Sequence, residues 1–466
     1  MPTTDENNAV KIRVSITIDE EEPIELLAME RGELQAGNLG FSLAEAKSLL
    51  ANGQKTLVDA QAAMHVQAQQ CEICGDPLRR KGRGTIVART LFGKMSVDSP
   101  RFYRCACSVI GASSRASFSP LAELLPERTL PELQYLQVKW AASMSYGLTL
   151  EILRDVFPIG DALGKEGVRN NVARVARRLE AELRDEPAAA VQNPPVVEAP
   201  PPTALLMIGI DGGYVRGRAG DGGKDGCFEV IVGKSVPVEG DAKCFGFVQR
   251  IEEKPKRRLR DVLDAQGYQE HQPIVFLSDG ADTVRNLQRD MSPNAEHILD
   301  WFHITMRITV MSNSIAGLEK GRMRKASSKL SDLLESVKWN TWHGKVDRAL
   351  ERAEELWGKL TTPFTATLRG KVRKLRAKLE EFIGYIDANR AFIPNYGKRY
   401  RTGKPISTSF AESTVDQIIS RRFVKKQQMR WTDQGCQNVL QIRTRVINDE
   451  LRPAVQRWHP TAQIAA

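Results

Sequence analysis

The chain has 466 residues, and its 67 Lys and Arg against 57 Asp and Glu leave a net charge of +10. At roughly 150 residues per domain this length predicts about three domains, and a hydrophobic content of 41% excludes wholesale disorder. The longest apolar stretches, such as 204–210, are too short to cross a bilayer, and the polar N-terminus predicts no secretory signal. Seven cysteines at this length favour a reducing cytoplasm over a disulfide scaffold.

The first elements expected along the chain are a strand at 11–19, where apolar and polar residues alternate, and a helix at about 42–69. Ser42 and Glu45 have the spacing of a capping box at the start of that helix. Strand-like segments follow within 71–107, and three helices are expected within 131–184. Residues 185–203 carry six prolines, which is typical of an extended linker and predicts a domain boundary.

After the linker the pattern changes to strands. Three strands are expected in succession from 204, then a helix near 257–267, the strand PIVFLSD, a short helix and a strand beginning at Glu296. This order is typical of a ribonuclease-H-like α/β core. A helical and highly charged stretch is expected from about 305 to 390, and two further helices around a basic turn within 408–450.

Four of the seven cysteines fall within 37 residues, as a CxxC pair and a CxC pair. Zinc in a structural site takes four soft ligands in a tetrahedron, so Cys71, Cys74, Cys105 and Cys107 predict a structural zinc site without a catalytic role. The alternative is four reduced thiols in a small β unit. A redox CxxC is disfavoured because no thioredoxin-like pattern surrounds it. The isolated cysteines are interpreted as buried small hydrophobes: Cys227, Cys244 and Cys436.

The helices within 131–184 end in a basic segment. A helix-turn-helix places its last helix in the major groove of DNA with basic and amide side chains outward. Asn170 and Asn171, near the start of the last helix, are candidates to reach base edges. The basic candidates for DNA contact on this helix are Lys165, Arg169, Arg174, Arg177 and Arg178. The alternative is a helical spacer with a solvated basic face.

Two aspartates follow strand-like runs, Asp211 after LLMIGI and Asp279 after IVFLS. In the expected sheet the first and fourth strands are adjacent and parallel, so the two carboxylates would face each other. Carboxylates in this arrangement, with a third from a later helix, hold two Mg²⁺ ions about 3.5–4 Å apart for phosphodiester chemistry. Taken singly, each aspartate could instead be a turn residue, because Asp-Gly-Gly and Ser-Asp-Gly are both good turn sequences.

Glu412 is the best candidate for the third carboxylate, because it opens an expected helix directly before the basic turn. Asp416, one helical turn on, is its main rival, and Asp282 is a rival for the position of Asp279. Asp300 and His303 are expected to support the site or to contact phosphate. The expected phosphate contacts in the basic turn are Arg421, Arg422, Lys425, Lys426 and Arg430.

Two more basic tracts lie between the second aspartate and Glu412. Residues 369–378 carry six basic residues and no acid, and residues 396–404 carry four. Such tracts neutralise phosphates, and Tyr396 and Tyr400 could stack on exposed bases. The alternative is a solvated helix face paired with nearby acids.

With these residues assembled, the chain resembles bacterial insertion-sequence transposases of the DDE class, and among them the Kra-type (ISKra) family. The resemblance is carried by segments spread through about 70–452: residues 117–149, IGIDGGYVRGR (208–218), LSDGAD (277–282), HILDWFHITMRITV (297–310) and ESTVDQIISRRFVKKQQMRW (412–431).

The resemblance implies Asp211, Asp279 and Glu412 as a catalytic triad and the helices at 305–395 as an insertion into the core. It also implies a [Cys/Asp]-x-x-His signature from Asp300 to His303 and a base-stacking role for Trp431. The CxC half of the cysteine cluster departs from the CxxC expected there.

The sequence therefore predicts a DNA transposase that uses Mg²⁺ or Mn²⁺ and structural Zn²⁺. It would bind double-stranded DNA at element ends and target, act as a dimer or larger assembly, contact no membrane and lie in the bacterial cytoplasm with the nucleoid. A DNA-binding regulator that lost the chemistry and a structure-selective nuclease on the same core are the alternatives. The expected regions are 1–70 (strand and helix), 71–120 (zinc module), 121–184 (helix-turn-helix-like), 185–203 (linker), 204–304 (ribonuclease-H-like core, first part), 305–395 (helical insertion) and 396–466 (core completion).

Overall fold

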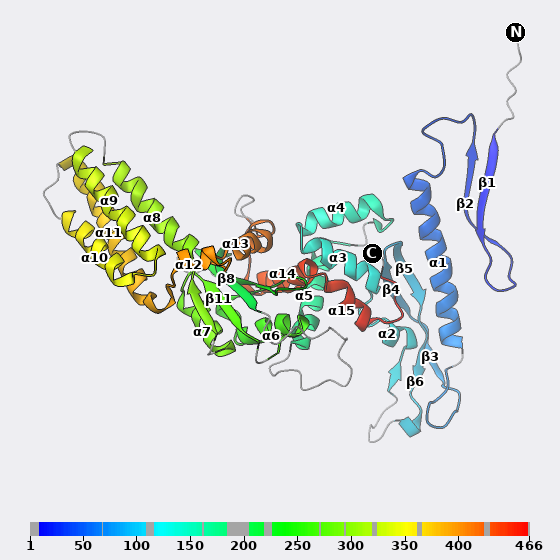
Figure 1. The fold of residues 1–466 in the computed structure, drawn as a ribbon. Helices are drawn as coiled ribbons and strands as arrows, with labels where there is room; N and C mark the ends of the chain where they lie inside the picture. Colours follow the sequence, from blue (N-terminus) through cyan, green and yellow to red (C-terminus); the bar gives the residue numbers. More distant parts are fainter. Residues whose placement is uncertain are drawn as a thin grey trace, which may run out of the picture. The chain divides into compact units, whose positions relative to one another are not determined.

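The computed structural model describes residues 9–67, 69–108, 116–160, 163–183, 205–218, 226–269, 272–292, 295–318, 324–360, 366–423 and 429–464. The chain divides into two compact units, one of Met1–Arg177 with Asp449–Ala466 and one of Arg178–Asn448 (Figure 1). The predicted linker at 185–203 lies outside the described residues. In the part of the chain that the structure describes, no helix is long and apolar enough to cross a membrane.

The first unit begins with an antiparallel hairpin and a long helix: β1 (Val10–Ile16), β2 (Ile24–Arg31) and α1 (Leu43–Gln67). The predicted capping box is confirmed, because Ser42 N–H donates to Glu45 Oε2 at 2.8 Å and Glu45 N–H donates to Ser42 Oγ at 3.2 Å. Arg31 bonds the same carboxylate at 2.7 Å and holds the pKa of Glu45 at about 2. The start of α1 is thereby fixed to the hairpin.

Short strands follow α1: β3 (Arg80–Gly82), β4 (Thr85–Thr90), β5 (Gly93–Asp98), β6 (Arg101–Tyr103) and β7 (Ser117–Phe118). β4 pairs with β5 in one sheet, and β3, β6 and β7 form another. Ala62 and Val66 of α1 pack on Ile86 and Met95, so the helix supplies the apolar cover that two strands alone lack.

The predicted helices within 131–184 are present as α3 (Pro131–Ala141), α4 (Tyr146–Val156) and α5 (Lys165–Glu182), preceded by the short α2 (Pro120–Leu124). Ser145 caps α4 by accepting a hydrogen bond from Leu148 N–H at 3.2 Å. The last helix of the chain, α15 (Leu451–Trp458), packs against α3. The first unit is therefore completed by residues from the C-terminal end of the chain.

The second unit is built on a five-stranded sheet of order β10-β9-β8-β11-β12. Its strands are β8 (Leu206–Arg216), β9 (Cys227–Val236), β10 (Lys243–Val248), β11 (Ile274–Ser278) and β12 (Glu296–Leu299). β8, β9 and β10 are antiparallel neighbours, whereas β11 is parallel to both β8 and β12. The prediction that the first and fourth strands are adjacent and parallel is confirmed.

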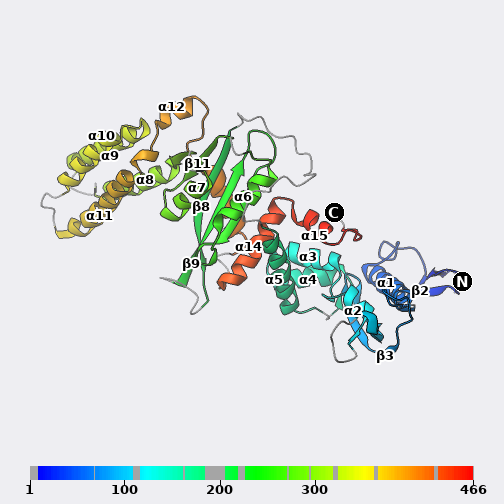
Figure 2. The same cartoon turned by 90° about the horizontal axis from the view of Figure 1, so that it is seen from below.

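Helices cover both faces of this sheet. Ile208 and Ile210 of β8 face a core shared with α6 (Pro255–Ala265) and α7 (Asp282–Met291), which Figure 2 shows along one face. The opposite face carries α13 (Ser409–Val415) and α14 (Asp433–Ile447). Successive residues of a strand point to opposite faces, so Asp211 lies on the α13 face.

The helical stretch between the second aspartate and Glu412 forms a bundle of α8 (Trp301–Ala316), α9 (Arg324–Trp342), α10 (Val346–Lys359) and α11 (Ala366–Ala388) (Figure 1). The short α12 (Tyr396–Arg401) follows it. The apolar core of the bundle continues into Leu277 and Leu299 of the sheet. Trp301 N–H donates to Ile406 O at 3.0 Å, so the bundle leaves the sheet and returns to it at one point.

A buried ion network beside the sheet has a large expected effect on stability. The guanidinium of Arg258, with its side chain 3% exposed, bonds Glu252 Oε2, Gln441 Oε1 and both carboxylate oxygens of Glu180. Arg258→Ala should lower the free energy of unfolding by about 3 kcal/mol, because it removes the nearest counter-charge of the buried Glu252 and leaves that carboxylate only Arg257, at 3.6 Å. Urea unfolding measures the loss, and Lys256→Ala, an exposed change on the same helix, should have little effect. Equal stability of the two variants would contradict this.

Candidate active site

Asp211 lies in the middle of β8, not at its end as predicted. β8 continues to Arg216 because it pairs with β9 along its whole length, whereas its parallel pairing with β11 ends at Gly209. The backbone around Asp211 is therefore held from one side only. Its side chain is 13% exposed, and its Oδ1 accepts a hydrogen bond from Gly212 N–H at 2.8 Å.

The glycines around Asp211 are close-approach positions, and the reading of Asp-Gly-Gly as a turn is wrong. A Cβ on Gly209 would lie 2.8 Å from Ala411 Cβ, and a Cβ on Gly213 would lie 2.6 Å from Ile419 Cδ1. On the other face, a Cβ on Gly212 would lie 2.8 Å from Glu229 Oε1. The glycines thus allow α13 to lie directly on the face of β8 that carries Asp211.

Asp279 follows β11 at the level of Asp211. Leu277 pairs with Gly209, and each aspartate follows two residues later in its own segment; the two carboxylates are near enough for the charge of Asp279 to raise the pKa of Asp211. Asp279 Oδ1 accepts a hydrogen bond from Ala281 N–H at 3.0 Å, and its backbone carbonyl accepts one from Tyr385 Oη at 2.9 Å. Burial raises the pKa of the Tyr385 hydroxyl well above its usual value, which keeps this donor protonated.

Asp300 and His303 complete the polar cluster from the start of α8. Asp300 is fully buried; its Oδ1 caps the helix by accepting from Phe302 N–H at 2.8 Å, and its Oδ2 accepts from the Thr408 hydroxyl. His303 Nε2 lies 3.7 Å from Asp300 Oδ2 and 3.9 Å from Asp211 Oδ1. The imidazole therefore stands between the two carboxylates.

The carboxyl groups of this cluster are buried and raise one another's pKa. Burial raises the pKa of Asp211, and the negative charges of Asp279 and Asp300 raise it further, while Gly212 N–H and His303 oppose the shift. Burial also raises the pKa of Glu229, with contributions from Asp279 and Asp211. Burial and mutual repulsion disfavour the ionised form of such acids. A divalent cation bound among them would offset that penalty. Glu229 was not predicted, because nothing in its strand sequence separates it from an ordinary exposed acid.

Glu412 belongs to α13, the helix that lies across β8. Its neighbours Ala411 and Val415 contact the glycine positions on either side of Asp211, but its side chain lies outside the described residues. A π-helical turn, Asp416–Ser420, follows. The rival Asp416 is exposed and lies 3.6 Å from Arg421 Nε, and the rival Asp282 has a side chain that is 92% exposed.

The contact between α13 and β8 gives a testable prediction. Gly209→Ala should destabilise the protein by about 1–3 kcal/mol, because the added methyl meets Ala411 and the Phe410 ring at 2.8 Å. Denaturant unfolding measures this. Gly384→Ala is the matched control: a Cβ there has open space within a helix, so it should leave stability unchanged or slightly higher. A neutral Gly209→Ala would show that α13 is not seated as described.

The predicted cysteine cluster is assembled in the first unit. Ligand atoms of Cys71, Cys74, Cys105 and Cys107 lie within 4.8 Å of one another, with Sγ pairs at 3.3–3.6 Å. Tetrahedral zinc with bonds of about 2.3 Å places sulfurs about 3.8 Å apart, so the cluster could hold a metal ion such as zinc. Backbone N–H groups of Cys74 and Ile73 lower the pKa of the Cys71 thiol to about 6. Gly75, at φ +76°, makes the turn that closes the loop from Cys71 to Cys74.

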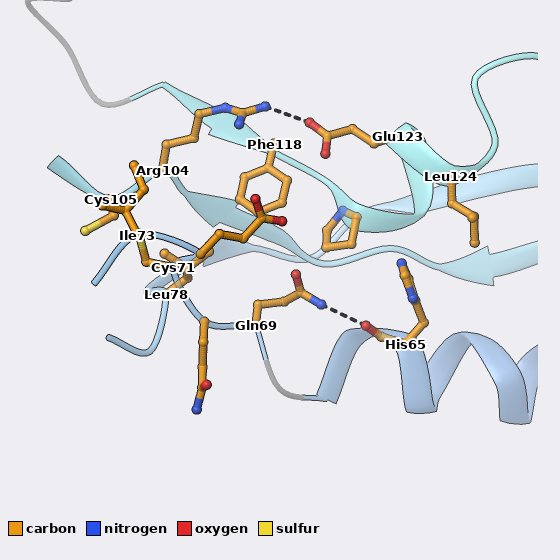
Figure 3. Close-up of a pocket in the computed structure, with 13 residues that line it drawn as sticks. His65, Gln69, Cys71, Ile73, Leu78, Arg104, Cys105, Phe118, Glu123 and Leu124 are labelled. Carbon is orange, nitrogen blue, oxygen red and sulfur yellow. Dashed lines mark hydrogen bonds and ion pairs between the residues drawn. The ribbon is translucent and has the colours of Figure 1, made fainter. Parts of the chain in front are cut away.

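A cavity of about 420 Å³ adjoins this cluster and shares Cys71 and Cys105 with it (Figure 3). Arg104 stands at its edge, where it bonds Glu123 at 2.7 Å and lies 4.8 Å from the centre of the Phe118 ring. The cysteine turns therefore form part of the cavity wall.

Some residues predicted to contact DNA from α5 face inward. Asn171 is buried and donates to Gln137 Oε1, so its amide is not free to reach a base edge. Arg174 donates to Asn171 Oδ1 at 2.9 Å and lies 3.7 Å from Glu127. Arg169 is exposed, although it pairs with Glu166 at 2.6 Å, and the remaining basic candidates, Lys165, Arg177 and Arg178, are exposed.

The basic turn after α13 is only partly exposed. Arg422 is buried, with its guanidinium carbon 4.8 Å from the centre of the Trp431 ring, contrary to the predicted phosphate contact. Trp431 itself is 7% exposed against Phe423, and its backbone pairs with Arg216 and Arg218 of the β8 segment. Arg421 and Arg430 are exposed, and Lys425 and Lys426 lie outside the described residues.

The tract at 396–404 is less available than its composition suggests. Tyr396 is fully buried and donates its hydroxyl to Leu299 O at 2.7 Å, and Arg399 is buried against Glu296 at 2.6 Å. The hydrogen bonds of these two side chains connect α12 to β12. Tyr400 is 67% exposed.

No protein-family model matches the chain, and no curated protein matches it. Among solved structures, it is similar to the Drosophila P element transposase strand transfer complex, with 10% identity and a TM-score of 0.32 over 73% of this chain and 95% of that one. A similarity at this level establishes neither a shared fold nor shared chemistry.

Proposed function

We propose that the chain is a DDE-type DNA transposase, which cleaves DNA at the ends of an insertion sequence and joins the freed 3′-hydroxyl to target DNA. The observation that carries the proposal is that Asp211 lies on β8, that Asp279 directly follows the adjacent parallel strand β11 and interacts electrostatically with Asp211, and that the helix of Glu412 lies across the Asp211 face. The strand order, antiparallel for three strands and parallel for two, supports a ribonuclease-H-like core.

Asp211, Asp279 and Glu412 would hold the metal, and Glu229, on the opposite face of β8, would add negative charge nearby. Two Mg²⁺ or Mn²⁺ ions on such oxygen ligands would supply activation of the attacking hydroxyl and stabilisation of the leaving oxygen. His303 would orient Asp211, and Asp300, locked by Phe302 N–H and Thr408, would fix the imidazole. Each step is an in-line displacement on phosphorus, first by water and then by the DNA 3′-hydroxyl.

The rest of the proposal concerns DNA recognition. We propose that the cysteine module at 71–120 and the helices at 121–184 bind the element ends, with Arg169, Arg177 and Arg178 contacting phosphates. We further propose that the linker at 185–203 joins them to a catalytic region of 204–304 and 396–448, interrupted by the insertion at 305–395; residues 449–466, predicted as part of this region, belong to the first unit. Joining two ends requires two active sites, so the active form would be a dimer or larger assembly on DNA. We also propose that the chain is a member of the ISKra family.

The test incubates purified protein with Mg²⁺ and labelled DNA carrying the segments that flank its own gene. Strand cleavage followed by joining to a second DNA is the expected result. Specific binding without cleavage would support the DNA-binding regulator instead. Cleavage that depends on DNA structure and never yields a joined product would support the nuclease.

The third carboxylate is tested separately. Glu412→Gln should reduce cleavage by about 10³-fold or more with DNA binding retained, because it removes a metal ligand without changing side-chain size. Asp416→Asn, at the exposed rival position that begins the π-helical turn after α13, should retain most activity. The reverse outcome would move the third carboxylate to Asp416.

A further inference from the structure

We propose that the groove between α8 and α11 holds a single-stranded segment of the DNA that is cut at the acidic site, which rests on the function proposed above. The groove has a volume of about 300 Å³. This is at the lower end of the range for sites that enclose small organic groups such as a nucleobase. Its lining includes His303, Met306, Arg307, Val310, Lys378 and Glu381.

The groove begins at the proposed catalytic site. His303 lines it and also lies 3.9 Å from Asp211 Oδ1. His303, Met306, Arg307 and Val310 share one face of α8, over a length of about 10 Å. A strand that passes the acidic site can therefore continue along this face without leaving the protein surface.

The walls of the groove include exposed apolar side chains. Met306 is 48% exposed and Val310 is 45% exposed, one helical turn apart on α8. Bases that are removed from a duplex are commonly held between apolar or aromatic side chains, and methionine adapts to flat surfaces of varied shape. These two side chains suit the face of an unpaired base.

The charge of the groove suits a sugar–phosphate backbone. Lys378 Nζ lies 3.4 Å from Ser314 Oγ, and Lys371 Nζ donates to Gly317 O at 3.2 Å, so these two lysines of the acid-free tract reach toward α8. Arg307 adds a third positive charge. Its Nη1 donates at 2.6 Å to Oε1 of Glu381, the acid that lines the groove. These charges extend outward from the site in the direction that a strand would follow.

The width of the groove favours a single strand. Packed helices have axes about 8–10 Å apart, which leaves no room for a duplex between their side chains. Arg376 of the same tract is directed to α10 instead, where its guanidinium carbon lies 4.4 Å from the centre of the Trp357 ring. The basic tract is thus divided between two helix faces, and only one of them borders the groove.

The test measures binding of a fluorescent oligothymidine of about 12 nucleotides, within the usual range of single-strand site sizes, to the full chain in EDTA at low salt. Met306→Glu and Lys378→Ala should each raise Kd roughly five- to tenfold, and binding to a duplex of the same length should be little changed. Arg373→Ala is the matched control: it removes the same charge from an exposed position on the opposite side of α11 and should change Kd less than about twofold. A 4-thiothymidine probe should cross-link to residues 303–310 or 378–381.

Equal losses in Lys378→Ala and Arg373→Ala, or cross-links confined to other segments, would overturn the groove assignment. Because this assay contains no metal, its result is independent of catalysis. Localised strand binding in a protein that never cleaves DNA would support the groove and contradict the transposase. Cleavage together with unchanged strand binding by both groove variants would overturn the groove alone.

Discussion

Asp211→Asn is expected to abolish Mg²⁺-dependent cleavage, by about 10³-fold or more, and at the same time to make the metal-free protein harder to unfold. The cleavage loss follows from removing a metal ligand at the centre of the site. The gain in stability follows because burial and neighbouring carboxylates raise the pKa of Asp211, so its charge at neutral pH opposes folding. The amide oxygen of Asn can still accept the hydrogen bond from Gly212 N–H.

The stability of the protein should depend on pH through Asp211. Since the folded-state pKa of Asp211 lies above its unfolded value, the wild-type protein loses stability as pH rises through the folded pKa. The stability advantage of Asp211→Asn should therefore be absent below the unfolded pKa and should grow as pH rises until it passes the folded pKa. Melting in EDTA measures it, at about 2–4 °C for each kcal/mol of relieved repulsion. Asp282→Asn, whose carboxylate is 92% exposed, is the control and should change neither property. A lower melting temperature for Asp211→Asn would contradict the account.

Cys71→Ser is expected to remove one equivalent of zinc and to unfold the small β module around it. The cluster lies among strands of two to six residues, which have little apolar core of their own beyond the patch under α1. Structural zinc contributes about 10–16 kcal/mol of apparent binding free energy in small zinc-finger peptides, far more than such a core. Metal analysis should give one zinc per chain, and a strong chelator should reproduce the effect of the substitution.

Hydrogen exchange distinguishes local unfolding of the β module from unfolding of the whole chain. Amides of 80–103 should lose protection in Cys71→Ser, whereas those of β8 and β11 in the second unit should keep it. Cys227→Ser changes a cysteine outside the cluster and should leave the zinc content unchanged. Wild-type protein that neither carries zinc nor takes it up, with the module still protected, would favour the reduced-thiol alternative.

The elements that could be predicted are those whose signals are local. The capping box at Ser42, the helix boundaries within 131–184 and the alternation of strands and helices after 204 each depend on neighbouring residues. The adjacency of Asp211 and Asp279 followed from that order, because few ways of arranging such strands exist.

The features that could not be predicted depend on partners distant in sequence. Asp-Gly-Gly has the composition of a turn, and only the helix from 409–415 and the side chain of Glu229 explain why glycine is needed within a strand. Asn171 has a polar side chain on a basic helix, yet Gln137 pairs with it inside the first unit. Arg422 and Trp431 belong to a basic, aromatic stretch typical of DNA contact, but they pack on each other. In each case tertiary packing decides which way a side chain faces.

The packing of α15 on α3 bears on how the protein is made. Residues 131–141 leave the ribosome more than 300 residues before Leu451–Trp458, the helix that covers them. The surface of α3 that α15 covers therefore stays exposed until the entire second unit has been synthesised. A nascent chain halted anywhere before Leu451 would expose part of α3. We thus expect fragments that end at residue 183 to be more protease-sensitive than the same residues in the full chain.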